Sequence, residues 1–276
     1  METDNYHSAL YYRYNEISKK IKLALSEGVL NLSELTWIYP SEVVILSNFI
    51  RLNPKIKVIP PKNKKVEDYI NRVTGMLRNN QPKTSFPAIS AKRLDNDYLD
   101  QMFKILEKFK YVKDSFKSSF MLIMSEMVEN ISSHSECSES IFTAQIFPRK
   151  GIMEMVFFDN GITIPKSLRM ASKFTDTTPD EEIIFNALNG ASATGEGWEG
   201  TGLNISAHLI LEFFKGDFIM CSGEGTVYNK RDKNAWKITK NPENKLEGTL
   251  IAFRLPLPLK CEGKEYTKFI NFAKFV

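Results

Sequence analysis

The sequence has few cysteines and no long apolar run. Its three cysteines, Cys137, Cys221 and Cys261, lie far apart and form no CxxC pair. This pattern argues against a disulfide framework or a zinc site and favours a reducing compartment. No stretch approaches the roughly 20 apolar residues of a membrane-spanning helix. The N-terminus also lacks an apolar segment of signal-peptide type. We therefore expect a cytoplasmic protein with no membrane partner.

A strong charge bias is also missing. The 276 residues include 37 basic and 33 acidic side chains, which give a net charge of +4. The densest basic run, residues 61–65, is typical of a solvated loop, so we expect no nucleic-acid partner. Hydrophobic residues make up 42% of the chain and charged residues 25%, the balance of a globular protein. The length suggests about one or two domains.

The first part of the chain, residues 1–92, is predicted to be a small α/β domain. The boundary is expected within 79–92, a stretch with two prolines and little periodicity. Ser41 is the expected N-cap of a helix that begins near Pro40. Apolar spacing predicts the other elements. They are helices at 8–28 and 66–77, an alternating strand-like segment from residue 29, and a strand at 57–60.

The second part, residues 93–276, has the pattern of an α+β domain. Two apolar runs, 141–147 and 152–158, are predicted to be strands paired through the turn PRKG. Later apolar segments predict further strands of an antiparallel sheet. They are DFIMCS, TVYNK, AWKIT and GTLIAFRLP. Helices are predicted at 95–109, 114–135, 178–190 and 201–214.

Within the helix predicted at 114–135, the stretch SEMVENISSH repeats polar groups at every fourth place. Glu126, Asn130 and His134 span an arc of about 80° on a helical wheel. An ordinary solvent-facing stripe beside a core face explains this pattern. A stripe that faces a ligand site is the alternative.

Three later stretches also carry candidate chemistry. In FFDNGITIP, residues 157–165, an apolar strand runs into Asp159-Asn160-Gly161. This stretch is either an ordinary turn or a buried carboxylate that could accept a hydrogen bond from an amine. In NGASATGEGWEGTGLN, residues 189–204, five glycines precede an apolar helix. The segment is either a flexible loop or a place where backbone N–H groups approach an anionic ligand. In EGTLIAFRLP, the pair Gly248-Thr249 opens a strand.

In order and spacing, these stretches resemble the motifs of the GHKL ATPase superfamily, which includes gyrase B and histidine kinases and shares the Bergerat ATP-binding fold. The resemblance covers roughly residues 100–257. It implies helices layered on a mixed, mostly antiparallel sheet. Four motifs carry it: Glu126, Asn130 and His134 as the N-box, DNGITI at 159–164, GTGLN at 200–204, and Gly248-Thr249.

The resemblance implies a binding site for ATP and Mg²⁺. Asn130 would coordinate Mg²⁺, and Glu126 would act as the catalytic base that orients or deprotonates the attacking group. Asp159 would accept from the adenine amine with support from Thr249, and Gly161 would leave room for the base. Further contacts are implied with the phosphates. They would come from the backbone of Gly200, Thr201, Gly202 and Leu203, with His134 either on the phosphate side or capping the helix.

The sequence departs from the family pattern at three places. Thr163 replaces the second glycine of the adenine motif and would be strained if that backbone needs a positive φ. Asn204 replaces the last glycine of the phosphate motif. Ser133 stands where histidine kinases often have lysine. The resemblance also implies that residues 166–199 form a mobile lid over the nucleotide.

Residues 30–46 resemble the strand–turn–helix of STAS domains, in which a serine at the helix start is phosphorylated; Ser41 lies at that position. No phospho-acceptor histidine is expected, since only His7 precedes the ATPase-like part. Three functions stay open: a regulatory ATPase or serine/threonine kinase of anti-sigma-factor type, a nucleotide-gated binding module, and a degenerate, purely structural domain. The expected partners are ATP and a regulatory protein, with a homodimer left open.

Overall fold

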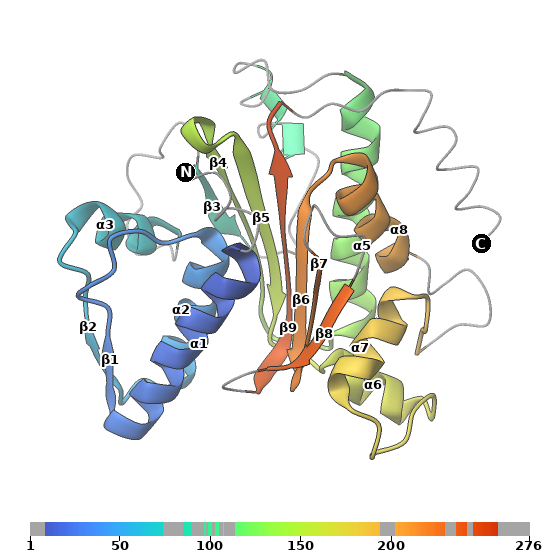
Figure 1. Cartoon of the computed structure of the whole chain (residues 1–276), viewed down its shortest axis with the longest axis horizontal. Helices are drawn as coiled ribbons and strands as arrows, with labels where there is room; N and C mark the ends of the chain where they lie inside the picture. The colour runs from blue at the N-terminus through green and yellow to red at the C-terminus, as the bar shows by residue number, and fades with distance from the viewer. Residues whose placement is uncertain are drawn as a thin grey trace.

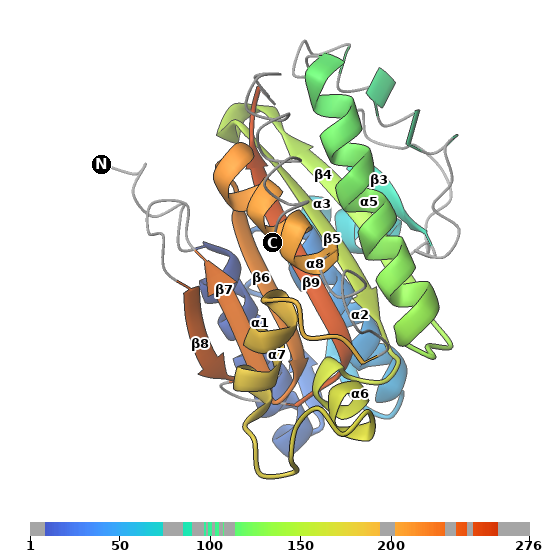
Figure 2. The same ribbon diagram turned by 90° about the vertical axis from the view of Figure 1, so that its right-hand side faces the viewer.

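Helices cover both faces of one large antiparallel sheet, so the described part of the protein has three layers (Figure 1). The structure, a computed structural model, describes residues 9–73, 85–89, 97, 99–100, 103–104, 107, 114–193, 202–229, 236–241 and 245–258. The view turned by 90° shows the helices of the second face lying along the sheet (Figure 2). The first face carries α1 (Ala9–Glu27) and α2 (Pro40–Leu52), and the second carries α5 (Asp114–His134), α7 (Asp180–Leu188) and α8 (Gly202–His208).

The large sheet has seven strands among the described residues, and every neighbouring pair is antiparallel. The predicted α+β class is therefore confirmed. The expectation of a mixed sheet is wrong for these residues, because parallel pairing occurs in a separate small sheet. In spatial order the strands are β3 (Ser85–Ile89), β4 (Ser140–Phe147), β5 (Ile152–Asp159), β9 (Leu246–Pro256), β6 (Asp217–Gly223), β7 (Gly225–Asn229) and β8 (Trp236–Lys240).

The central strands are largely apolar on both faces because both faces are covered. On β5, Met153, Met155 and Phe157 join the core beneath α5 and α8. Val156 and Phe158, which alternate with them, join the core beneath α1 and α2. Side chains of a strand point alternately to opposite faces. The largely apolar runs at 141–147 and 152–158 predicted two paired strands, and the structure confirms this pairing.

On the second face, α5 and α8 pack side by side. Helix α6 (Ile164–Met170) follows β5. Helix α8 continues into a π-helical turn, η4 (Leu209–Phe213), and α8 and η4 together account for the helix predicted at 201–214. At one end Phe116 of α5 packs against Phe214, with ring centroids 4.8 Å apart. At the other end Glu126 lies beside Gly202. Helices α5 and α8 therefore run antiparallel. The helix expected at 95–109 lies mostly outside the described residues.

The N-terminal part is a small βαβ unit. Strands β1 (Val29–Asn31) and β2 (Lys57–Ile59) pair in parallel, with α2 between them in the chain. Helix α1 and strand β2 match the elements predicted at 8–28 and 57–60, and α3 (Lys64–Val73) matches the described part of the helix predicted at 66–77. No helix among the described residues combines the length and apolar character needed to cross a membrane.

The N-terminal unit and the sheet share one hydrophobic core. Leu30 and Val43 belong to the same buried cluster as Val156, Phe158 and Leu250 of strands β5 and β9. Strand β3 also precedes residue 92 and pairs with β4 in the large sheet. The domain boundary near residue 92 stays a prediction, and structural elements on both sides of it contribute to the sheet.

The expectation that Ser41 caps helix α2 is wrong. Tyr39 is the N-cap, and its backbone N–H donates to Glu42 at 2.8 Å. Ser41 lies inside the first turn, where its hydroxyl and its backbone N–H both donate to Oε1 of Glu154, at 2.7 and 3.0 Å. Pro40 supplies the first helical residue and needs no partner for a backbone N–H. The serine hydroxyl is therefore used for contact with the sheet and not for capping.

Candidate functional site

A cavity of about 560 Å³ lies between α5, the ends of β5 and β9, and helices α6, α7 and α8. Its lining includes residues that the sequence singled out in four separate motifs. The chain brings these motifs together because α5 and α8 pack side by side over the strand ends. The predicted site residues that line the cavity are Glu126, Asn130, Gly202, Leu203, Asp159 and Thr249.

The polar stripe of α5 faces this cavity. Glu126 and Asn130 both line it, together with Glu129 and Ser133 of the same helix. The Asn130 amide nitrogen donates to the Glu126 backbone carbonyl at 2.8 Å, so the amide oxygen is the end left to meet a ligand. Burial, and then the nearby Glu129 carboxylate, raise the pKa of Glu126 above its ordinary value.

Gly202 brings the start of α8 against α5. A β-carbon at Gly202 would overlap the Glu126 carboxylate. A larger residue would therefore push that acid out of its place beside the helix start. Asn204, which replaces a family glycine, donates from its amide to the Leu188 carbonyl at 2.7 Å. This departure from the family pattern ties the first turn of α8 to the end of α7.

Asp159 and Thr249 lie opposite each other in the lining, where strand β5 ends and β9 begins. They are register partners on β5 and β9, and both are largely buried. One Asp159 oxygen accepts the Gly161 N–H at 2.9 Å. Gly248 makes the pairing possible, because its φ is +94° and a β-carbon there would overlap the Asp159 carbonyl. The Gly-Thr pair therefore places a hydroxyl beside a buried carboxylate.

Two predicted site residues are described but do not line the cavity. Gly161 packs against the Ser135 carbonyl, which a β-carbon would overlap, so its small size makes room for backbone. Thr163 has a φ of −70° and is the N-cap of α6, with its hydroxyl accepting from the Lys166 N–H at 3.3 Å. The Thr163 backbone therefore does not need a positive φ, and no strain arises there. The side chain of His134, together with Gly200 and Thr201, lies outside the described residues.

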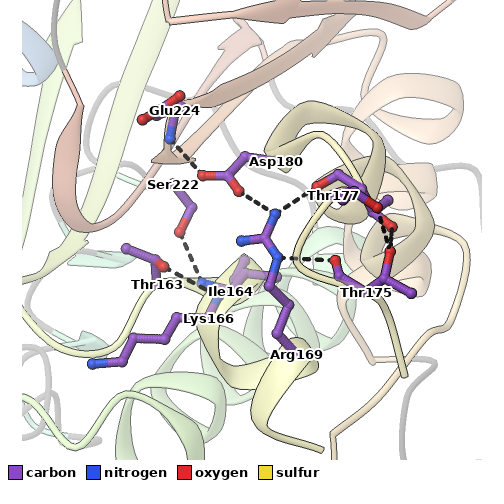
Figure 3. Close-up of polar contacts among 10 residues, drawn as sticks. Thr163, Ile164, Lys166, Arg169, Thr175, Thr177, Asp180, Ser222 and Glu224 are labelled. Atoms are coloured by element: carbon purple, nitrogen blue, oxygen red, sulfur yellow. Dashed lines mark hydrogen bonds and ion pairs between the residues drawn. The ribbon is translucent and has the colours of Figure 1, made fainter. Parts of the chain in front are cut away.

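The described part of the segment expected to be a lid contains the end of α6 and the whole of α7, and these two helices contact each other. Figure 3 shows how the segment is fastened: Arg169 of α6 pairs with Asp180 of α7 at 2.7 Å. Asp180 also accepts the Glu224 N–H at 2.8 Å from the β6–β7 turn. Helix α7 packs against β7 and β8. Residues 166–193 are thus attached to the sheet, and 194–199 lie outside the described residues.

Sequence reasoning did not assign the wall of the cavity that α6 and α7 provide. Ile164 and Leu168 of α6 and Ala187 of α7 line it, as do Glu129 and Ser133 of α5. The i, i+3, i+4, i+7 spacing of Glu126, Glu129, Asn130 and Ser133 was a readable signal for the α5 residues. For α6 and α7, the apolar spacing marks a buried face without saying what that face meets.

The cavity lining is acidic among the described residues. It contains the carboxylates of Glu126, Glu129 and Asp159 and no lysine or arginine from the described ranges. The same ranges contain no group of three or more His, Cys, Asp or Glu side chains placed to hold a metal ion. Carboxylates that face a bound anion repel it unless a cation lies between them.

The scan against protein-family models and the search of curated proteins give no match for this chain.

Proposed function

We propose that the protein binds ATP with Mg²⁺ and hydrolyses it or transfers its terminal phosphoryl group, as a GHKL-type regulatory protein of the anti-sigma-factor kinase class. One observation carries the proposal: Glu126, Asn130, Asp159, Gly202 and Thr249, from four separate motifs, converge on one cavity. Its volume of about 560 Å³ lies in the range of small-molecule and cofactor sites.

Asp159 and Thr249 would hold the base. A buried carboxylate at a strand end accepts hydrogen bonds from an amine, and the adjacent Thr249 hydroxyl adds a second polar group. Apolar lining from Ile162, Ile164 and Ile251 would cover the faces of a planar ring. This end of the cavity therefore fits an aminopurine.

Asn130 would hold Mg²⁺ through its amide oxygen, because its nitrogen is already engaged with the Glu126 carbonyl. Mg²⁺ commonly takes one or two protein oxygens and completes its shell with phosphate and water. The ion would also offset the repulsion between the phosphates and the Glu126 and Glu129 carboxylates, which share the cavity.

Glu126 would be the general base. It lies beside the start of α8, where the GTGLN motif meets the cavity. Burial raises the pKa of this carboxyl group, which makes it a better proton acceptor than an exposed glutamate. A water molecule or a protein hydroxyl held between Glu126 and the terminal phosphate would be activated for attack.

A nucleotide-gated binding module with little turnover is the second candidate. The observation that favours it is that both α7 and α8, which flank the glycine-rich segment, line the cavity. A ligand in the cavity would touch both helices, so its binding would favour one arrangement of the two helices over others. That change could alter affinity for a regulatory protein without phosphoryl transfer.

The experiment combines binding and turnover in one variant series. We would titrate the protein with ATP in Mg²⁺ by calorimetry and follow γ-labelled ATP for phosphate release and protein labelling. Asp159→Ala should abolish binding, whereas Glu126→Gln should bind ATP and lose turnover. Wild-type protein that binds no ATP would falsify the proposal. Binding without phosphate release or labelling would select the binding module.

A further inference from the structure

Ser222 lies behind the proposed base site without lining the cavity. It is on β6, fully buried, and is the register partner of Thr249 on β9. Its hydroxyl accepts the Ile164 N–H at 2.9 Å, a contact drawn in Figure 3. The same hydroxyl lies 2.9 Å from the Thr249 hydroxyl and donates to the Gly248 carbonyl at 3.2 Å. Ser222 therefore connects β6, β9 and the start of α6.

The Ser222 contacts can all be satisfied at once only if the Thr249 hydroxyl is the donor between the two hydroxyls. A serine hydroxyl has one proton to donate and two lone pairs that accept. If Ser222 gives its proton to the Gly248 carbonyl, the Thr249 hydroxyl must donate to Ser222. One Ser222 lone pair then takes the Ile164 N–H, and the other takes the Thr249 proton. All three contacts are satisfied together in this arrangement.

Thr249 can then offer only lone pairs to the cavity. An ionised Asp159 carboxylate also only accepts, so the two groups at this end form an acceptor pair. An exocyclic amine, which donates, matches such a pair. A carbonyl at the same place on the ring would face acceptors and leave them without a partner, which costs binding energy.

We propose that Ser222 is a positioning residue that fixes the Thr249 hydroxyl as an acceptor and thereby sets a preference for a 6-amino over a 6-oxo purine. This inference rests on the proposed nucleotide site and adds a residue that never touches the ligand. Without Ser222, the Thr249 proton loses its partner and can turn toward the cavity. A turned hydroxyl would donate to a carbonyl as readily as it accepts from an amine.

The test compares ATP with inosine triphosphate, which replaces the 6-amino group by a 6-oxo group. Affinities for both are measured by calorimetry in Mg²⁺. Wild type should prefer ATP by about tenfold or more, since one well-made polar contact is worth about 1–2 kcal/mol. Ser222→Ala should reduce this preference at least about threefold, while the Asp159 carboxylate, which still only accepts, keeps the remainder. Ser47→Ala is the control, since the Ser47 hydroxyl bonds only its own helix, to the Val43 carbonyl at 2.7 Å.

A second pair of variants keeps the inference testable if Ser222→Ala does not fold. Thr249→Ser retains the hydroxyl and should keep the preference, whereas the isosteric Thr249→Val should reduce it as much as Ser222→Ala does. In the double variant, Ser222→Ala should cause no further loss beyond Thr249→Val. An unchanged preference in Ser222→Ala or Thr249→Val, or independent additive losses, would overturn the role of Ser222 while leaving ATP binding intact. Failure of wild type to bind ATP would overturn the proposed function itself.

Discussion

Glu154 on β5 and Arg254 on β9 form a buried ion pair in the middle of the sheet. The Nε and one terminal nitrogen of Arg254 each lie 2.7 Å from Oε2 of Glu154. The Arg254 side chain is 2% exposed and that of Glu154 is fully buried. The other Glu154 oxygen accepts both donors of Ser41. A single carboxylate thus joins two central strands to the N-terminal unit.

Removing one partner of this pair should strongly destabilise the protein. Glu154→Ala removes the carboxylate that is hydrogen-bonded to the buried Arg254 charge, which costs about 3–5 kcal/mol of unfolding free energy. Chemical denaturation measures the loss. The exposed pair between Lys62 and Glu34 is the control, and Glu34→Ala should leave the denaturation midpoint in place. Equal effects of the two substitutions would contradict the assignment of Glu154 as a buried structural charge.

Ser41 should tolerate alanine better than a second carboxylate. Ser41→Ala loses the hydroxyl donor to Glu154, at a cost of about 1–3 kcal/mol. Ser41→Asp places like charges together in a buried site and should destabilise more, by an amount that thermal unfolding can rank. If Ser41→Asp is as stable as Ser41→Ala, the serine has room for a negative group. That result would favour the resemblance to phosphorylated STAS serines.

Glu42 should make stability depend on pH. Burial raises the pKa of Glu42 from 4.5 to about 7, against the opposing effect of Arg13. The folded state then binds a proton more tightly than the unfolded state, so this contribution is present below about pH 4.5 and is lost as pH rises to about 7. Each pKa unit corresponds to about 1.4 kcal/mol.

Glu42→Gln isolates this effect, because glutamine keeps an oxygen to accept the Tyr39 N–H without a titrating group. Relative to the variant, wild type should lose unfolding free energy between about pH 4.5 and 7, measured by urea denaturation at several pH values. Parallel pH profiles for the two proteins would count against a raised pKa at Glu42.

Two glycines with positive φ allow the cost of backbone strain to be measured apart from the cost of a steric clash. Gly28 has a φ of +71° and open space where a β-carbon would lie, whereas Gly248 has a φ of +94° and abuts the Asp159 carbonyl. Alanine at Gly28 should cost about 1 kcal/mol from strain alone. Alanine at Gly248 should cost clearly more, because β9 must also move away from β5. Comparable denaturation midpoints would mean that the strand ends can separate freely.

Gly202→Ala should damage the site more than the fold. The added methyl group would displace the Glu126 carboxylate from the start of α8. We expect ATP to bind and phosphate release to fall at least about tenfold, as for a misplaced catalytic group. Circular dichroism and binding calorimetry check fold and affinity. Unchanged turnover would show that Glu126 does not need this placement.

The sequence predicted elements whose patterns are local. The strands at 141–147 and 152–158 were predictable because their residues are largely apolar and a turn separates them. The α5 stripe was readable because i, i+4 spacing places Glu126 and Asn130 on one face. That the α5 stripe and the end of the strand at 152–158 would meet at a single cavity could be proposed only through the family resemblance.

Contacts between distant segments could not be predicted. Ser41 matches a helix N-cap in sequence, and its true partner, Glu154, lies 113 residues away. Ser222 shows no motif, since its importance depends on strand register with Thr249. The ion pair of Arg169 with Asp180, which joins α6 to α7 within the segment expected to be a lid, also depends on the folded arrangement.

The pairing of β5 with β9 places Glu154 opposite Arg254 and, five residues further along, Asp159 opposite Thr249. A slip of one residue would turn every side chain of one strand to the other face. Arg254 would then enter the apolar layer under α5 and α8, and Glu154 would lose its counter-charge. The ion pair thus disfavours every shifted alignment of the two strands, and the alignment it selects is the one that assembles the cavity.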